Sequence, residues 1–382
     1  MIAVLSRARG GRANRALPRT YGQSLRAFPG HWARLGLVLV AVIYVVTPLR
    51  LTDDWLNILT VCGCYAVGAI GLNLLTGFTG QVSIGQAFFV AAGGYTVAHF
   101  SSGVASQGHL RWVTQQPLLI SLLGAAIVGA ILGALIGPFA LRLRGNYLAI
   151  VTLALLFLGF YLFKNATDLT GGGSGVNYAP SLAIGPFDFT KLHNGAYSDQ
   201  QGYFWLVWGF VALAALLARN LVRSRAGRAM QAVRDRDLAA EVIGVSQMRT
   251  KIGVFAVSSA FASVGGALYY SVIQQNLEPT QVSQLPGLVM SITFVAIIIV
   301  GGLGSVWGCI VGALIVQGLP QLINRYTGSL PFLGPDGIMS VASFNNFIFG
   351  VMIVAFLLLE PYGLAAVWRR IKGYFQAWPF SY

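Results

Sequence analysis

Residues 117–141 read PLLISLLGAAIVGAILGALIGPFAL, an apolar run that contains no charged side chain. A helix needs roughly 20 apolar residues to cross the hydrocarbon core of a bilayer, so this run is long enough to span a membrane. Other apolar runs lie on both sides of it, and together they give ten predicted spans: residues 35–51, 55–76, 81–100, 117–141, 146–163, 203–220, 252–273, 287–301, 306–324 and 344–360. The sequence therefore predicts an all-α, polytopic integral membrane protein with about ten transmembrane helices.

The composition agrees with this prediction. Of the 382 residues, 56% are hydrophobic and 9% are charged, whereas an ordinary soluble domain carries about 25% charged residues. A chain this apolar cannot cover itself with polar groups in water, which excludes a soluble globular enzyme and a disordered protein. The three cysteines, Cys62, Cys64 and Cys309, lie inside apolar runs. We expect them to be small buried side chains rather than metal ligands or disulfides.

The basic residues predict the orientation of the chain. Of the 25 Lys and Arg residues, seven lie in the N-terminal tail, two in the 142–144 turn, eight between residues 219 and 251, and three after residue 368. These 20 residues share one side of the predicted topology, and the positive-inside rule places that side, with both termini, in the cytoplasm. The net charge of +14 is therefore explained by membrane topology, and no nucleic-acid partner is predicted.

The same topology divides the chain into three parts. Residues 1–34 form a basic cytoplasmic tail, which we expect to touch anionic membrane lipid. Residues 35–361 form the transmembrane domain, with an outer loop at 164–202 and an inner segment at 221–250. Residues 362–382 form a cytoplasmic C-terminal tail.

Several kinds of chemistry are missing from the sequence. The four histidines are scattered and no lysine follows a glycine, so neither a metal site nor a Walker A nucleotide loop is predicted. The acidic residues all fall in loops or at the ends of spans, whereas proton- or sodium-coupled carriers usually keep carboxylates near the midplane of the membrane. We expect no cofactor, no metal and no enzymatic activity, and transport of a solute without net charge that is driven from elsewhere.

A polar, glycine-rich stretch lies at membrane depth, where residues 77–86 read GFTGQVSIGQ. Its glycines permit a break in the third span, and the side chains of Gln81, Ser83 and Gln86 are candidates to line a solute path. Helix packing and turn formation are the alternative. The triplet Gln-Val-Ser recurs at 281–283, a hint of an inverted repeat of five plus five spans. The spacing of Gly129, Gly133 and Gly137 instead predicts a packing stripe.

The inner segment contains a short predicted helix. Asp237 is a suitable N-cap and Gly244 a suitable left-handed stop, and about two turns of helix fit between them. A helix this short is not stable alone and needs a docking partner or the membrane surface. The small side chains of Ala239 and Ala240 would let it seat in a groove. An ordinary charged cytoplasmic loop is the alternative.

Four blocks of the sequence closely resemble the permeases of branched-chain amino acid ABC importers, of the LivM type. The first runs from Gly71 to Phe89 and continues with Gly93, Gly94 and Tyr95. The others are residues 143–153, the inner segment continued to Lys251 and on to residues 261–268, and residues 301–308 followed by Gly312 and Ala313. The resemblance covers residues 50–360, and the blocks occur in the order typical of the family.

The resemblance implies a half-transporter in the bacterial inner membrane. Its expected partners are two cytoplasmic ABC ATPase subunits, a second related permease chain and a periplasmic solute-binding protein. The inner segment resembles the part through which such permeases dock onto the ATPase, which gives these candidate coupling residues: Arg234, Asp235, Asp237, Ala239, Ala240, Glu241 and Gly244. The candidate solute path comprises Asn73, Gln81, Ser83 and Gln86. The expected function is ATP-driven import of branched-chain or other neutral amino acids by alternating access. A urea or short-amide importer and an ion-coupled secondary carrier are the alternatives.

Overall fold

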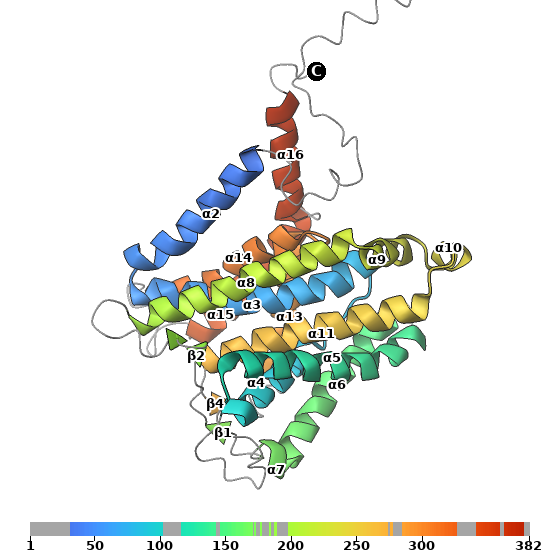
Figure 1. Ribbon diagram of the computed structural model, residues 1–382, viewed down its shortest axis with the longest axis horizontal. Coiled ribbons are helices and arrows are strands. Elements are labelled where there is room, and N and C mark those ends of the chain that lie inside the picture. Colours follow the sequence, from blue (N-terminus) through green and yellow to red (C-terminus); the bar gives the residue numbers. More distant parts are fainter. Residues whose placement is uncertain are drawn as a thin grey trace, which may run out of the picture. The chain divides into compact units, whose positions relative to one another are not determined.

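The computed structural model of the protein (Figure 1) describes residues 31–101, 116–142, 146–170, 172, 176–177, 183–184, 187–188, 198–273, 276–277, 285–326, 341–359 and 363–377. The chain divides into two compact units, residues 1–50 and residues 51–382. Within the first unit, α2 (His31–Arg50) is an apolar helix with exposed side chains and Pro48 in its last turn. The N-terminal tail up to residue 30 lies outside the described residues.

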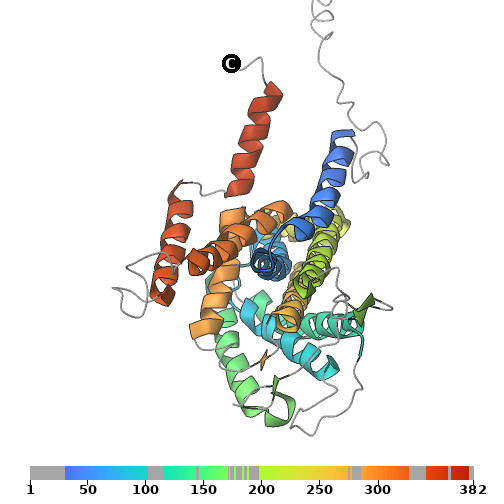
Figure 2. The ribbon, with the colours of Figure 1, turned by 90° about the vertical axis from the view of Figure 1, so that its left-hand side faces the viewer.

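Helix α3 (Asp53–Thr79) forms the centre of the second unit. Almost all of its side chains are buried, because α8 (Asp199–Arg223), α11 (Gln247–Val272), α13 (Leu285–Gly301) and α14 (Val306–Tyr326) pack around it. Figure 2 shows α3 end-on among these helices. An amphipathic pattern is absent from α3 because every face of this helix meets protein.

Helix α11 connects the centre to a second layer. It packs against α3 and also against α4 (Gln86–Ser101) and α5 (Leu118–Arg142). The predicted packing stripe accounts for the closeness of α5, since a Cβ placed on Gly133 would lie 2.7 Å from the Cβ of Ser259, and one placed on Gly137 would lie 3.1 Å from the Cα of Ile252. The prediction of a stripe is confirmed.

The remaining elements lie around this arrangement. Helix α6 (Asn146–Asn165) packs against α4 and is followed by the short α7 (Thr167–Thr170). Helices α15 (Val341–Leu359) and α16 (Leu364–Ala377) both pack against α13 and α14. Two antiparallel pairs of two-residue strands complete the fold: β1 (Val176–Asn177) with β4 (Asn276–Leu277), and β2 (Ala183–Ile184) with β3 (Phe187–Asp188).

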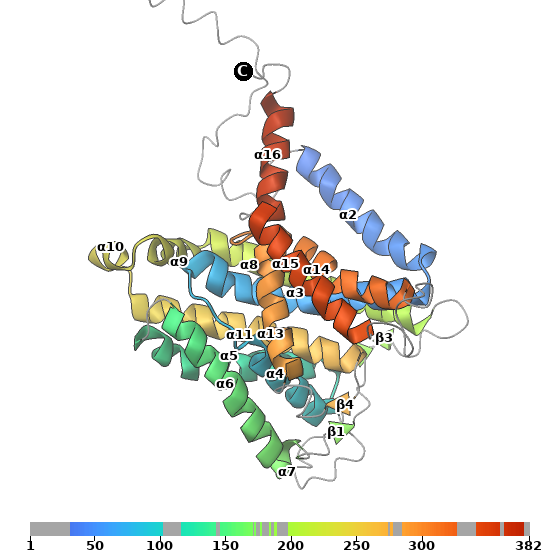
Figure 3. The ribbon, with the colours of Figure 1, turned by 180° about the vertical axis from the view of Figure 1, so that it is seen from behind.

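The inner segment forms two helices rather than a loop. Helix α9 (Arg225–Asp235) begins at Ser224, whose side chain accepts a hydrogen bond from the N–H of Gly227, and α10 (Asp237–Val242) follows directly. Figure 3 shows both of them at the same end of α3, α8 and α11. The fold thus presents a helical extension at one end of its central helices.

The predicted spans coincide with helices, but not all of these helices are long. Among the described residues, six helices are long and apolar enough to cross a membrane: Asp53–Thr79, Leu118–Phe139, Tyr147–Asn165, Asp199–Arg223, Gln247–Val272 and Val306–Ile323. Three shorter apolar helices are Val38–Arg50, Gly287–Gly301 and Phe347–Phe356. The third predicted span, 81–100, becomes helical only at Gln86. The protein is therefore a helical, polytopic membrane protein, and the count of ten spans stays a prediction. The segment 281–283, on which the inverted repeat was predicted, lies outside the described residues.

Candidate functional site

The chain between α3 and α4 is irregular although Gln81, Ser83 and Gly85 within it are buried. Helix α3 ends at Thr79, and Gly80 follows with φ +72°, a left-handed conformation that suits glycine. The Thr76 hydroxyl donates to the carbonyl of Gln81 at 3.0 Å, and the N–H of Ile84 donates to Oγ1 of Thr152 in α6 at 3.0 Å. These bonds replace part of the hydrogen bonding that a helix would supply, so the break in the helix is stabilised by specific contacts.

Four side chains were predicted for a solute path, and they fall into two groups. Among the residues that the structure describes, both amide atoms of Gln81 and the hydroxyl of Ser83 are buried and have no hydrogen-bond partner. The Gln86 amide, in contrast, donates to the carbonyl of Gly68 at 3.2 Å. Asn73 is intermediate, because its Oδ1 accepts from the N–H of Gly304 at 2.9 Å while its Nδ2 finds no partner in the described part of the chain. A buried polar group without a partner costs about 1–3 kcal/mol, and of the four candidates Gln81 and Ser83 carry only such groups on their side chains. Their place on a solute path stays a prediction.

One arginine joins the coupling segment to this polar break. The Arg234 guanidinium, at the end of α9, donates to the carbonyl of Gly77 in the last turn of α3. There is no room for a side chain at Gly77, where a Cβ would collide with Oδ1 of Asn73 and the N–H of Gly304. A positive charge at a helix C-terminus is also favourable for the helix dipole. The end of α3, the turn between α13 and α14, and α9 therefore meet at one point.

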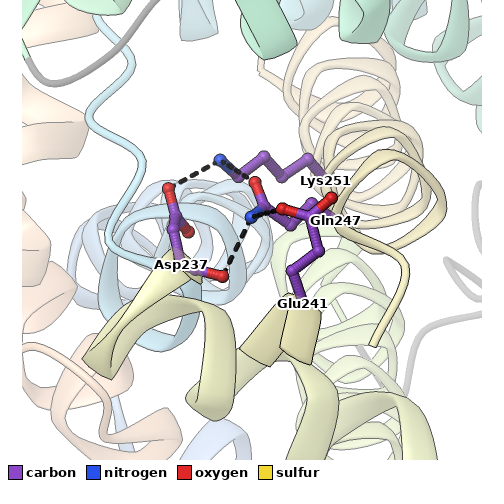
Figure 4. Close-up of polar contacts among 4 residues, drawn as sticks. All are labelled: Asp237, Glu241, Gln247 and Lys251. Carbon is purple, nitrogen blue, oxygen red and sulfur yellow. Dashed lines mark hydrogen bonds and ion pairs between the residues drawn. The ribbon is translucent and has the colours of Figure 1, made fainter. Parts of the chain in front are cut away.

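A second contact holds α10 to the first turns of α11 (Figure 4). The Lys251 ammonium lies 2.9 Å from Oδ2 of Asp237. The Gln247 amide donates to the Asp237 carbonyl at 2.9 Å and to Oε2 of Glu241 at 3.1 Å. Lys251 is only 8% exposed, and it is the one charged side chain among the buried residues that the structure describes. This cluster fastens the short helix to the helix that packs against α3, α4 and α5.

The two faces of α10 differ sharply. Ala240 is only 2% exposed and is turned toward the protein's own chain, whereas Leu238, Val242 and Ile243 are 70%, 88% and 74% exposed. A shallow concavity between α9 and α10 is lined by Ala232, Asp235, Arg236, Ala239, Ala240 and Ile243. The apolar residues available to a partner are thus Leu238, Val242 and Ile243, which we name the α10 apolar face.

One detail of the predicted helix is corrected. Asp237 was predicted as the N-cap, but Arg236 occupies that position and Asp237 is the first helical residue. The Asp237 side chain is used instead for the ion pair with Lys251. Ala240, which was predicted to let the helix seat in a groove, is covered by its own chain, and its part in docking stays a prediction. The predicted left-handed stop is confirmed, since Gly244 has φ +86°.

Lys251, Gln247, Gly77 and the α10 apolar face were missed as functional candidates. The contacts of Gln247 and Lys251 with α10, and of Gly77 with α9, join residues that only tertiary packing brings together. Local patterns in the sequence do not show them. The α10 apolar face did carry a signal, namely three large apolar residues in an otherwise charged segment. In the described part of the chain, no group of three or more His, Cys, Asp or Glu side chains is arranged to hold a metal ion.

Known proteins resemble this chain over most of its length. It is 27% identical to the high-affinity branched-chain amino acid transport system permease protein LivM of Escherichia coli (strain K12), over 88% of this chain and 76% of that protein. It is 24% identical to the LivH permease protein of the corresponding system of Salmonella typhimurium, over 83% of this chain and 96% of that protein. It is 26% identical to the L-arabinose ABC transporter permease protein AraH of Azospirillum brasilense, over 78% of this chain and 84% of that protein.

No solved structure is significantly similar to the chain. A family profile described as "Branched-chain amino acid transport system / permease component" matches residues 55–357. The match includes the polar break, the Arg234–Gly77 contact and the whole of α9, α10 and α11. The chain therefore belongs to the family of branched-chain amino acid transport system permease components.

Proposed function

We propose that the protein is the membrane subunit of an ABC importer that moves branched-chain or other neutral amino acids into the cell. The observation that carries this proposal is the pair of contacts at the coupling segment. Arg234 joins α9 to the polar break, and Lys251 joins α10 to α11. A partner that moves α9 and α10 would therefore act directly on the helices that frame Gln81 and Ser83.

The proposed mechanism is alternating access driven by ATP hydrolysis in separate subunits. Two cytoplasmic ATPase subunits bind the α10 apolar face of this chain and of a second, related permease chain. Closure of the ATPases moves α10, and α11 follows because the Asp237–Lys251 ion pair and the Gln247 hydrogen bonds fasten the two helices together. A short helix gains stability by docking, since it has too few residues to be stable alone.

The proposed orientation follows from the basic residues. Helix α9 and the residues that flank it carry much of the positive charge of the chain, and the positive-inside rule favours a cytoplasmic location for them. We propose that both termini lie on this side of the inner membrane. A periplasmic solute-binding protein would then deliver the solute at the opposite end of α3, α8 and α11.

The substrate class is proposed from the names of the relatives and from the polar break. LivM and LivH are named for branched-chain amino acids, and the buried, unpartnered groups of Gln81 and Ser83 are neutral hydrogen-bonding groups. A neutral sugar is a second candidate, because a relative of similar identity is named for L-arabinose. Both candidates are solutes that a path without charged side chains can accommodate.

Reconstitution tests this proposal. The chain is placed in liposomes alone, and also together with the partner permease, ATPase and solute-binding subunits of the same organism. Uptake of radiolabelled leucine should require every subunit and ATP, and unlabelled isoleucine and valine should compete with it. Competition by L-arabinose but not by isoleucine would establish the second candidate. Uptake by the isolated chain under a proton or sodium gradient would contradict the proposed function.

A further inference from the structure

Helix α16 has the composition of a helix that binds a membrane surface. Its sequence, LAAVWRRIKGYFQA, contains three basic residues and no acidic residue. The helix lies beyond residue 357, where the family match ends, so its role does not follow from membership of the family.

The helical period places the apolar and the basic residues of α16 on different sides of the helix. Leu364, Trp368, Ile371 and Phe375 recur at intervals of three or four, and Val367 and Tyr374 flank them on the same side of the helix. Arg369, Arg370 and Lys372 occupy the other positions. A helix with an apolar side that carries aromatic residues, and with a basic opposite side, is typical of helices that lie in the interface of a bilayer.

The start of α16 is anchored at the end of the bundle where α9 lies. A Cβ placed on Gly363 would lie 2.6 Å from the Cα of Gly302, in the turn between α13 and α14. In the same turn, Gly304 donates to Asn73, and a Cβ placed on it would lie 3.4 Å from the Arg234 guanidinium. From this anchor α16 runs across the direction of α3, α8 and α11 (Figures 1 and 2). Since α3, α8 and α11 are candidate membrane spans, a helix that runs across them is oriented parallel to the plane of a surrounding bilayer.

Leu364 at the start of α16 packs against the core, but further along the helix the apolar side is exposed in the described part of the chain. Trp368 is 67% exposed, Tyr374 is 60% exposed and Ile371 is 44% exposed. Such a contiguous apolar surface is not left in water by a stable protein. The three basic residues of α16, in a helix whose own sequence has no acidic residue, favour an anionic occupant, and Trp and Tyr are the residues enriched at membrane–water interfaces.

We propose that α16 is an interfacial helix that inserts its apolar side into the cytoplasmic leaflet and binds anionic lipid headgroups through Arg369, Arg370 and Lys372. The proposal goes beyond the proposed transport function. It relies only on the proposed cytoplasmic location of both termini. Anionic phospholipid offers acyl chains to the apolar side of the helix and negatively charged headgroups to its basic residues. A second copy of this chain would bring the same positive charge and would repel it.

The test uses the full chain in lipid nanodiscs. An environment-sensitive NBD label is attached at Tyr374→Cys, in a background where the three buried native cysteines are replaced by alanine. Nanodiscs are prepared from phosphatidylcholine alone and from phosphatidylcholine with increasing phosphatidylglycerol. We expect the label to be quenched by lipids brominated on their acyl chains, and the quenching should rise with phosphatidylglycerol. A label at Arg369→Cys, on the basic side, should be quenched less.

A charge variant supplies the control for lipid specificity. Each basic residue near an anionic surface contributes about a fivefold factor in affinity. Replacement of Arg369, Arg370 and Lys372 together by glutamine should therefore weaken the apparent affinity for phosphatidylglycerol, read from the quenching curve, by at least about tenfold. Three results would overturn the proposal: quenching that is equal with and without phosphatidylglycerol, quenching by aqueous iodide in every lipid, or protection from both quenchers, which would indicate a protein occupant. None of these measurements requires transport activity, so their outcome is independent of the test of the proposed function.

Discussion

Arg234 donates a hydrogen bond to the main-chain carbonyl of Gly77, a residue 157 positions earlier in the chain. The contact joins the last turn of α9 to the last turn of α3. Four residues upstream of Gly77, Asn73 binds Gly304 with one side-chain atom and leaves its Nδ2 unpaired. The arginine therefore lies between the segment proposed to bind the ATPase and the buried polar groups proposed to contact the solute.

Replacement of Arg234 by leucine should uncouple ATP hydrolysis from transport. A hydrogen bond to a charged group contributes about 1.5–3 kcal/mol, so its loss should reduce solute-stimulated ATPase activity of the reconstituted importer by roughly tenfold or more. Arg228→Leu is the matched control, because Arg228 is exposed and its guanidinium, among the described residues, donates only to the nearby Arg223 carbonyl. Equal activity of the two variants would show that Arg234 has no part in coupling.

The ion pair between Asp237 and Lys251 should respond unequally to removal of its two partners. The Lys251 side chain is 11% exposed and the Asp237 side chain is 40% exposed. Asp237→Ala leaves a nearly buried ammonium without its carboxylate, and should lower the free energy of unfolding by about 1–3 kcal/mol. Lys251→Met leaves a carboxylate that water can still reach, so its effect should be smaller.

Thermal unfolding of both variants and of the double variant, in detergent, measures this asymmetry. The double-mutant cycle should give a coupling energy of about 0.5–3 kcal/mol for the pair. Strictly additive effects would mean that the two residues act independently and that α10 is held to α11 by other contacts. Gln247 would then be the next residue to test, since its amide bonds both Asp237 and Glu241.

The helices of this fold could be predicted from the sequence because apolar runs and small-residue spacing are local signals. The Gly129, Gly133 and Gly137 stripe was predicted to pack, and α11 fills it through Ser259 and Ile252. The start of α4 was less predictable. The polar residues before Gln86 predicted a break, but the contact with Thr152 that helps to hold the broken chain depends on how α6 packs.

The candidate site could be predicted only in part. The polar stretch and the short inner helix were visible, because glutamines at membrane depth and large apolar residues among charges are unusual. Which side of α10 meets a partner was not predictable, because six residues are too few for a periodicity to define a face. The contacts of Arg234 and Lys251 depend on how distant helices pack, and that information is not contained in local spacing.

The α10 apolar face should be necessary for ATPase binding but not for folding. Val242 is 88% exposed, so Val242→Asp should change the free energy of unfolding by no more than about 0.5 kcal/mol. The same change should weaken binding of the ATPase subunit by tenfold or more, because it places a charge in an apolar interface. Pull-down of the ATPase with the detergent-solubilised variant measures this effect.

Ala240→Trp is the contrasting variant for the same helix. Ala240 is covered by its own chain, so a large side chain should overpack the protein and lower the free energy of unfolding by about 1–3 kcal/mol. A stable Ala240→Trp protein that fails to bind the ATPase would reverse the assignment of the two faces of α10.

Gln81 and Gln86 should behave in opposite ways when leucine replaces them. The amide of Gln81 is buried without a partner, so Gln81→Leu removes an unpaired polar group at similar volume. The free energy of unfolding should rise by about 1–3 kcal/mol while solute uptake slows. The amide of Gln86 binds the Gly68 carbonyl, so Gln86→Leu should lower the free energy of unfolding by about 1 kcal/mol.

Thermal unfolding in detergent and initial rates of uptake in proteoliposomes, measured on the same two variants, separate a solute contact from a packing contact. A residue that binds solute is expected to lower the stability of the solute-free protein, because its polar atoms find their hydrogen-bond partners only in the solute. Gln81→Leu should therefore be more stable and less active than the unmodified chain. A variant that is more stable and fully active would assign Gln81 to packing. A variant that is less stable would mean that another part of the assembled importer satisfies the amide.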